Sequence, residues 1–194
     1  MDCSGYNIRI VRRHPILEIN VSQLLKSGLG ATRDYPVNDE VDITGEGNLS
    51  PVKGEVRLTR TDRGILVVGV LHTEVEVPCS RCLTQFSLQL ALDIEEEYFP
   101  TIDVSSGVAV DVPNEPGCFT IDEHHILDLT EAVRQYALTA IPIQTLCKQE
   151  CAGLCPVCGQ NLNVKHCGHK VKEVDERWAK LLELKSSGGA RGKG

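Results

Sequence analysis

The stretch Phe86-Ser-Leu-Gln-Leu-Ala-Leu-Asp-Ile-Glu95 decides the fold, because apolar and mostly polar side chains alternate along it. Large apolar side chains occupy every second position, namely Phe86, Leu88, Leu90, Leu92 and Ile94. A period of two is the spacing of one face of a β-strand. The stretch therefore predicts a strand with one buried face and one exposed face.

A hairpin is expected to precede this strand. Val56 and Leu58 alternate with polar neighbours, and Asp62-Arg63-Gly64 then predicts a hairpin turn. The mostly apolar run from Ile65 to Val77 follows as a long strand. Cys79-Ser-Arg-Cys82 separates that run from the Phe86 strand. We therefore expect the two thiols at the tip of an antiparallel hairpin, presented together.

Helical signals lie on either side of the strands. Asn20 to Gly28 predicts a short helix with Asn20 as its cap. Asp128-Leu-Thr-Glu131 has the capping-box pattern and predicts a helix that stops at Ile141-Pro142. A last helix is expected from Asp175 to Lys185.

The remaining segments predict irregular structure. Asp34 to Ser50, rich in Gly and Asp, predicts loop or short strand, and Thr101 to Gly117 predicts a flexible acidic loop. Together the elements predict an α+β fold, with an antiparallel β-sheet or partial barrel, a few covering helices and a small C-terminal zinc-ribbon-like module. The expected domains are 1–143 for the sheet core, 144–185 for the cysteine-rich metal module and its helix, and 186–194 for a disordered tail.

Metal-ligating residues crowd the C-terminal third, as Cys147, Cys151, Cys155, Cys158, Cys167 and His169. A C-x2-C pair followed by Gly, as in Cys155-Pro-Val-Cys158-Gly, forms a turn that aims two thiolates at one metal ion. Thiolates at this density would repel one another without a cation. The pattern predicts a structural metal site, with zinc as first choice and iron left open.

The spacing does not decide which four groups bind. Cys155 and Cys158 are the surest pair, and Cys167 with His169 could close a local site. Cys147 and Cys151 could instead supply the partner pair, or they could join the second-choice pair Cys79 and Cys82 in a second site. The isolated Cys3 and Cys118 are expected to be ordinary cysteines, and His124-His125 to have no metal-binding role.

Charge is distributed unevenly along the chain, whose net charge is −7. The segment from Cys82 to Val133 holds eleven acidic residues and no Lys or Arg, whereas the segment from Arg134 onward has ten basic and five acidic residues. An acidic stretch of this kind repels nucleic acid and suits a basic protein partner. We find no apolar run long enough to span a membrane and no signal-peptide pattern. Nine cysteines, an odd number, then predict a reducing, cytoplasmic setting.

Several motifs carry a resemblance to a known family. They include Asn20-Val-Ser-Gln-Leu-Leu, Pro-Cys79-Ser-Arg-Cys82-Leu, Glu95-Glu-Glu-Tyr-Phe and Asp175-Glu-Arg-Trp, with Gly-Leu-Cys-Pro-Val-Cys-Gly-Gln-Asn-Leu-Asn from Gly153 to Asn163 as the most specific. In their order along the chain they resemble the YceD family, the large ribosomal RNA subunit accumulation proteins. The resemblance implies a role in the synthesis, processing or stability of 23S rRNA, and hence in large-subunit assembly. Many members have Cys-x-Cys where this chain has Cys167-Gly-His169, and imidazole can replace a thiolate on zinc.

Common enzyme motifs are absent from the sequence, including G-x-S-x-G, the phosphate-binding Gly-rich loop and H-E-x-x-H. We therefore expect no catalytic activity and no small-molecule substrate. The alternatives are a thiol-disulfide redox protein that uses its C-x-x-C pairs and a zinc-ribbon regulatory adaptor. The expected partner is a ribosomal protein or a pre-50S particle, with at most weak contact to rRNA and none to a membrane.

Overall fold

A computed structural model describes residues 17–112 and 117–169 of the 194-residue chain. Internal contacts divide the chain into two units. Among the described residues, the sheet unit comprises 17–78, 85–112 and 117–145, and the cysteine unit comprises 79–84 and 146–169. The predicted boundary after residue 143 lies close to this division. However, the prediction kept the Cys79–Cys82 turn with the sheet, whereas the contacts group it with the C-terminal cysteines.

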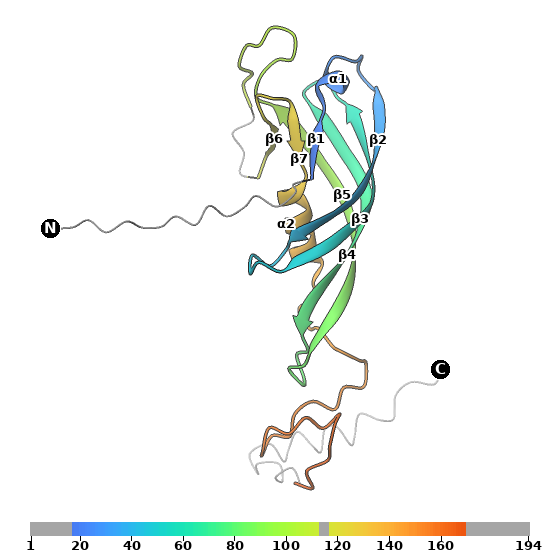
Figure 1. The fold of residues 1–194 in the computed structure, drawn as a ribbon, viewed down its shortest axis with the longest axis vertical. Helices are drawn as coiled ribbons and strands as arrows, with labels where there is room; N and C mark the ends of the chain where they lie inside the picture. The colour runs from blue at the N-terminus through green and yellow to red at the C-terminus, as the bar shows by residue number, and fades with distance from the viewer. Residues whose placement is uncertain (1–16, 113–116, 170–194) are drawn as a thin grey trace, which may run out of the picture. The chain divides into compact units, whose positions relative to one another are not determined.

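A seven-stranded sheet that curves into a half-barrel forms most of the sheet unit (Figure 1). The strand order across the sheet is β1-β7-β6-β5-β4-β3-β2. The strands are β1 Glu18–Asn20, β2 Thr32–Asp42, β3 Leu49–Arg60, β4 Ile65–Pro78, β5 Gln85–Pro100, β6 Phe119–Ile121 and β7 Ile126–Asp128. Neighbouring strands run antiparallel except for β5 and β6, which are parallel. The structure thus confirms the α+β class and the mainly antiparallel sheet.

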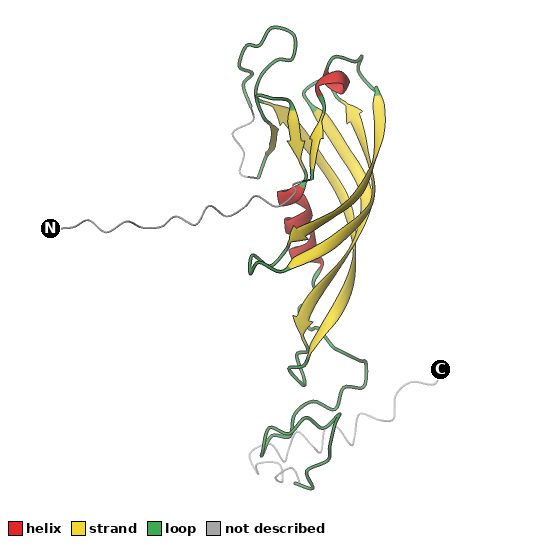
Figure 2. Cartoon of the chain, viewed as in Figure 1, coloured by secondary structure: helices red, strands yellow, loops and turns green. Residues whose placement is uncertain are grey.

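Two helices accompany the sheet, α1 Ser22–Leu25 and α2 Thr130–Ala140 (Figure 2). Helix α1 is shorter than the predicted helix, although Asn20 Oδ1 does accept a hydrogen bond from the N–H of Ser22 at 3.1 Å. Helix α2 begins within one residue of the predicted start, and Asp128 Oδ1 accepts from the N–H of Thr130 at 2.8 Å. The predicted capping box does not form, because the Glu131 carboxylate accepts from Arg134 and Gln135 instead. The helix ends before Pro142, as expected for a residue that cannot continue a helix.

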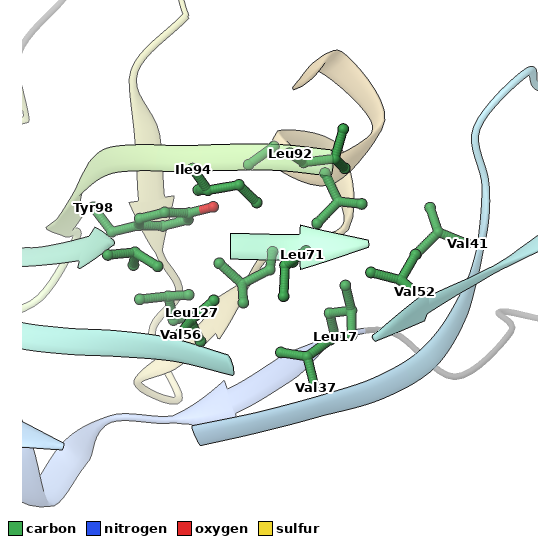
Figure 3. Close-up of a cluster of buried hydrophobic side chains, with 14 of the residues drawn as sticks. Leu17, Val37, Val41, Val52, Val56, Leu71, Leu92, Ile94, Tyr98 and Leu127 are labelled. Carbon is green, nitrogen blue, oxygen red and sulfur yellow. The ribbon is translucent and has the colours of Figure 1, made fainter. Parts of the chain in front are cut away.

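The core of the sheet unit lies between the concave face of the sheet and α2 (Figure 3). The period-two residues of β5 point into it as predicted, with Leu90, Leu92 and Ile94 buried. Helix α2 contributes its buried face of Ala132, Val133 and Ala137. Burial of aliphatic side chains at about 25 cal/mol per Å² is the main force that stabilises this unit.

The prediction of loop or short strand for Asp34 to Ser50 is wrong. This region forms the eleven-residue strand β2 and the start of β3, paired in continuous register from Thr32 with Thr59 to Asp42 with Leu49. Only Val37 and Val41 of β2 are buried, so its sequence shows no simple alternation. Because β2 is an edge strand, its polar residues and its proline are tolerated there.

The three-residue strands β1, β6 and β7 were not predicted, since strands of this length leave too little periodicity in a sequence. Residues 101–112 contain no helix or strand, although Ile102 and Ala109 form an isolated bridge. The predicted helix from Asp175 to Lys185 and the predicted tail 186–194 lie outside the described residues. Within the described part of the chain, no helix has the length and hydrophobicity to cross a membrane.

Gly64 is expected to be required for the sheet, because a Cβ atom at this position would overlap the carbonyl oxygen of Tyr98 on the adjacent strand. Gly64→Ala should lower the free energy of unfolding by about 2–3 kcal/mol, as overpacking against backbone does. Chemical denaturation measures this loss. Gly28→Ala is the matched control, since a Cβ there would meet no atom within 4 Å. Equal stability of the two variants would contradict the register described for β4 and β5.

Candidate metal centres

The Cys79–Cys82 turn is held by its own backbone. The N–H of Cys79 donates to the carbonyl of Thr84 at 3.0 Å, and the N–H of Leu83 donates to the carbonyl of Cys79 at 2.9 Å. The N–H of Arg81 points at Cys79 Sγ from 3.5 Å. The turn therefore fixes the position of Cys79 Sγ and places a backbone N–H donor beside it.

The Cys155–Cys158 turn repeats this scheme at the same offsets. The N–H of Cys155 donates to the carbonyl of Gln160 at 2.8 Å, the N–H of Gly159 donates to the carbonyl of Cys155 at 2.9 Å, and the N–H of Val157 lies 3.4 Å from Cys155 Sγ. The two C-x2-C turns thus share one backbone structure, although only the second has a glycine after its second cysteine.

The residue after the second cysteine takes a left-handed backbone conformation in both turns. Its φ is +71° at Gly159 and +59° at Leu83. Glycine adopts this conformation without steric cost, whereas a leucine there is strained by about 1–2 kcal/mol. Leu83 is 65% exposed, so packing of its side chain does not offset the conformational strain. The turn geometry itself holds Leu83 in this conformation.

The first cluster consists of Cys79, Cys82, Cys147 and Cys151, whose sulfur atoms all lie within 4.8 Å of one another. Cys79 Sγ is 3.8 Å from Cys151 Sγ, and Cys82 Sγ is 3.6 Å from Cys147 Sγ. Three of the four side chains are buried, and Cys147 is half-buried. All four cysteines are free thiols in the structure, so this cluster could hold a metal ion.

The second cluster consists of Cys155, Cys158, Cys167 and His169, with ligand atoms again within 4.8 Å of one another. His169 Nδ1 lies 3.9 Å from Cys155 Sγ. This cluster is more open than the first, since only Cys155 is buried while Cys158 and His169 are exposed. It too could hold a metal ion, and His169 would then supply the ligand in place of a fourth thiolate.

Backbone donors favour the thiolate form of the first cysteine in each turn. The N–H groups of Cys147 and Cys82 lower the pKa of Cys79 to about 6, and those of Cys158 and Val157 lower the pKa of Cys155 to about 6. Burial raises the pKa of Cys147 to about 12, together with the neighbouring thiols. Hydrogen bonds with Thr84 lower the pKa of Cys82 as well. Each cluster thus holds at least one sulfur already suited to a cation, because the thiolate is the form that binds metal.

Two asparagines that sequence reasoning did not single out support the first cluster. Asn163 Nδ2 donates to Cys151 Sγ at 3.2 Å, while Asn163 Oδ1 accepts from the N–H of Ala152 at 2.9 Å. Asn161 accepts from Asn163 through its Oδ1 and donates to Thr84 Oγ1 at 3.1 Å through its Nδ2. Both asparagines belong to the Gly-Gln-Asn-Leu-Asn string identified in the sequence. However, the spacing of this string gives no link to a cluster that includes Cys79 and Cys82.

The eight predicted ligands therefore fall into two groups of four. The pair Cys147 and Cys151 lies with Cys79 and Cys82, and the pair Cys167 and His169 lies with Cys155 and Cys158. Cys79 and Cys82, the second choice from the sequence, are thus part of a complete four-cysteine cluster. Neither Cys118 nor the pair His124-His125 belongs to a cluster of this kind in the described residues.

Leu83→Gly is expected to stabilise the cysteine unit by about 0.5–1 kcal/mol, because glycine removes the left-handed strain and the exposed leucine makes little contact. Amide hydrogen exchange in residues 79–84 and 146–169 measures the change. Leu29→Gly is the control, followed by amide exchange in the sheet unit to which Leu29 belongs, since Leu29 is similarly exposed, at 71%, but has no left-handed φ. Leu29→Gly should lower stability slightly. If Leu83→Gly also lowered stability, the left-handed strain assigned to Leu83 would be contradicted.

Comparison with known proteins places the chain among ribosome-related sequences. Residues 67–185 match the family described as "Large ribosomal RNA subunit accumulation protein YceD". An uncharacterised protein of Mycobacterium tuberculosis is 30% identical over 132 residues, which cover 67% of this chain and 60% of the relative. A protein of Arabidopsis thaliana named "Large ribosomal RNA subunit accumulation protein YCED homolog 1, chloroplastic" is 25% identical, covering 87% of this chain and 57% of the relative. A protein of the same name from Zea mays is 28% identical over 63% of this chain and 50% of the relative.

The chain thus spans about 60% or less of the length of these curated relatives. No solved structure matches it. The matched region begins within β4 and runs past His169, so it contains all eight residues of the two clusters.

Proposed function

This chain belongs to the YceD family of large ribosomal RNA subunit accumulation proteins, and we propose that it supports the accumulation of 23S rRNA and the assembly of the large ribosomal subunit. The observation that carries this proposal is the family match over residues 67–185, which includes parts of both units and every clustered cysteine. The named relatives from Arabidopsis thaliana and Zea mays agree with it. We propose that the protein acts in the cytoplasm as a binding factor and catalyses no reaction.

An acidic face on the sheet unit supports contact with a basic protein. The exposed sides of β3, β4 and β5 carry five carboxylates, namely Glu55, Glu74, Glu76, Asp93 and Glu95. We call this set the acidic face. Lys53 and Arg57 are the exposed cations among the same residues of these strands. Charge complementarity of this kind favours a basic ribosomal protein over naked RNA, whose phosphates the acidic face would repel.

The run Glu95-Glu96-Glu97 contributes only one exposed carboxylate side chain to the acidic face. Glu96 accepts a hydrogen bond from Tyr136 Oη at 3.0 Å, and Glu97 pairs with Arg63 at 2.9 Å and accepts from Thr61 Oγ1 at 2.8 Å. Only Glu95 of the three is exposed. We therefore propose that the partner surface consists of exposed acids from three strands rather than of one stretch of sequence.

We further propose that zinc is the metal of the cysteine unit and that its role is structural. Tetrahedral sites with three or four cysteines and at most one histidine are typical of structural zinc. Cys155, Cys158, Cys167 and His169 form such a donor set. The metal would keep this unit folded so that it can take part in binding.

Co-sedimentation tests the proposed function. A tagged full-length protein is recovered from growing cells, and the lysate is separated on a sucrose gradient at low and at physiological salt. We expect the protein in fractions that contain large-subunit precursors, and we expect basic ribosomal proteins to be recovered with it. Confinement of the protein to the top of the gradient under both conditions would contradict the proposal.

A further inference from the structure

We propose that Cys79, Cys82, Cys147 and Cys151 bind a metal ion of their own, separate from the ion assigned to Cys155, Cys158, Cys167 and His169. The ion belongs to the class that accepts four thiolates in a tetrahedron, such as Zn²⁺, and the protein would then carry two metal ions. This inference concerns the chemistry of the cysteine unit and does not depend on the ribosomal role.

The sulfur positions fit a tetrahedral ion. With a metal–sulfur distance of about 2.3 Å, two ligands of a regular tetrahedron lie about 3.8 Å apart. Cys79 Sγ and Cys151 Sγ are separated by 3.8 Å, and Cys82 Sγ and Cys147 Sγ by 3.6 Å. These distances lie far beyond the ~2.05 Å of a disulfide bond. Four thiols therefore converge at the spacing that one metal ion requires.

The backbone of the Cys79–Cys82 turn gives independent support. It repeats the hydrogen bonds of the Cys155–Cys158 turn position by position, including the left-handed residue after the second cysteine. At Leu83 this conformation is strained, and strain of this kind persists only where the surroundings impose it. Hairpin loops can also contain a left-handed residue, so the support comes from the match with the Cys155–Cys158 turn, whose identical backbone aims two sulfurs at one point.

The groups around the first cluster favour negative charge on its cysteine sulfurs. Asn163 Nδ2 donates to Cys151 Sγ, and Asn161 fixes the orientation of Asn163. The Arg81 guanidinium lies 3.2 Å from the carbonyl of Cys151 and brings a positive charge to a site where four thiolates and a divalent ion would leave a net negative charge. Hydrogen-bond donors that surround ligands in this way are typical of metal sites.

Asn161 and Asn163 link the Cys155–Cys158 turn to the surroundings of the all-thiolate site. They follow the Cys155–Cys158 turn directly in sequence, yet their side chains serve the other cluster. The all-thiolate site joins segments 65 and 72 residues apart. A metal ion there would close a long loop, and such closures restrict the unfolded chain strongly.

Metal analysis of the full-length protein tests the proposal. After reducing, chelator-free purification, the wild type should contain about two equivalents of metal. Cys82→Ser and Cys158→Ser should each contain about one, and Cys118→Ser should keep two. After substitution with cobalt, Cys82→Ser should retain the visible spectrum of a three-thiolate, one-imidazole site, and Cys158→Ser that of a four-thiolate site. One equivalent in the wild type, or a disulfide between any of the four cysteines in place of a metal, would overturn the proposal.

Asn163→Asp tests the site without removing a ligand. The new carboxylate keeps the acceptor for Ala152 but replaces the donor to Cys151 with a negative charge. Metal affinity at the all-thiolate site should fall about 10–100-fold in chelator competition, while the other site keeps its affinity. Gln160→Glu makes the same chemical change, and Gln160 contributes its carbonyl to the Cys155–Cys158 turn through the backbone. That control should leave the all-thiolate site unchanged, and equal behaviour of the two variants would overturn the assignment.

Discussion

Complete removal of metal is expected to unfold the cysteine unit and to leave the seven-stranded sheet folded. In the described residues of the cysteine unit, the buried side chains are those of Cys79, Cys82, Cys151 and Cys155. The two valines among these described residues are exposed, at 59% for Val157 and 79% for Val164. Because the described residues of this unit bury no aliphatic side chain completely, we expect the unit to depend on its metal, and structural zinc supplies about 10–16 kcal/mol of binding energy in comparable small modules.

Amide hydrogen exchange of the full chain, before and after dialysis against a strong chelator, measures this effect. Protection should disappear from residues 146–169 and from the turn 79–84, while the amides of β3, β4 and β5 should keep theirs. Restoring zinc should restore the protection. A cysteine unit that stays protected without metal would show that the ion is not its source of stability.

Reversing the charge of Glu76, Asp93 and Glu95 to lysine is expected to weaken binding to large-subunit precursors by at least about tenfold. All three side chains are exposed on β4 and β5. Exposed charge contacts contribute about 0.2–1 kcal/mol each to the binding free energy, and reversal adds repulsion of similar size, so the three changes together cost about 1.2–6 kcal/mol. Co-sedimentation with purified precursor particles at physiological salt measures the change.

The matched control reverses Glu18, Glu46 and Glu123, which are exposed outside the acidic face and change the net charge by the same amount. Binding of this control should remain close to that of the wild type. Equal weakening by both triple variants would mean that net charge, and not the acidic face, governs the contact. Tight binding of naked 23S rRNA fragments by the wild type would contradict a protein partner.

The sequence predicted those parts of the fold whose periodicity is long and regular. The alternation from Phe86 to Ile94 identified β5, and the Asp62-Arg63-Gly64 turn placed β3 and β4 beside each other. Strand β2 was missed because an edge strand with two buried valines has almost the composition of a loop. The short strands β1 and β7 are defined by their pairing, Ile19 with Leu127, between segments more than a hundred residues apart.

The sequence predicted which residue types make up the candidate sites. It did not predict how the eight ligands divide into two clusters. C-x2-C spacing identified the turns, yet only the folded chain brings Cys82 to Cys147. The role of Asn163 was hidden for the same reason, since its partner Cys151 belongs to the other cluster. Leu83 also gave no signal, because a leucine does not indicate a left-handed turn.

We propose above all that this protein supports accumulation of the large ribosomal subunit. Depletion of the protein from the cells that produce it, followed by sucrose-gradient analysis of their ribosomes, tests that claim most directly. We expect large subunits and mature 23S rRNA to fall relative to small subunits, and we expect re-expression of the wild-type chain to restore them. An unchanged ratio of large to small subunits after depletion would contradict the account.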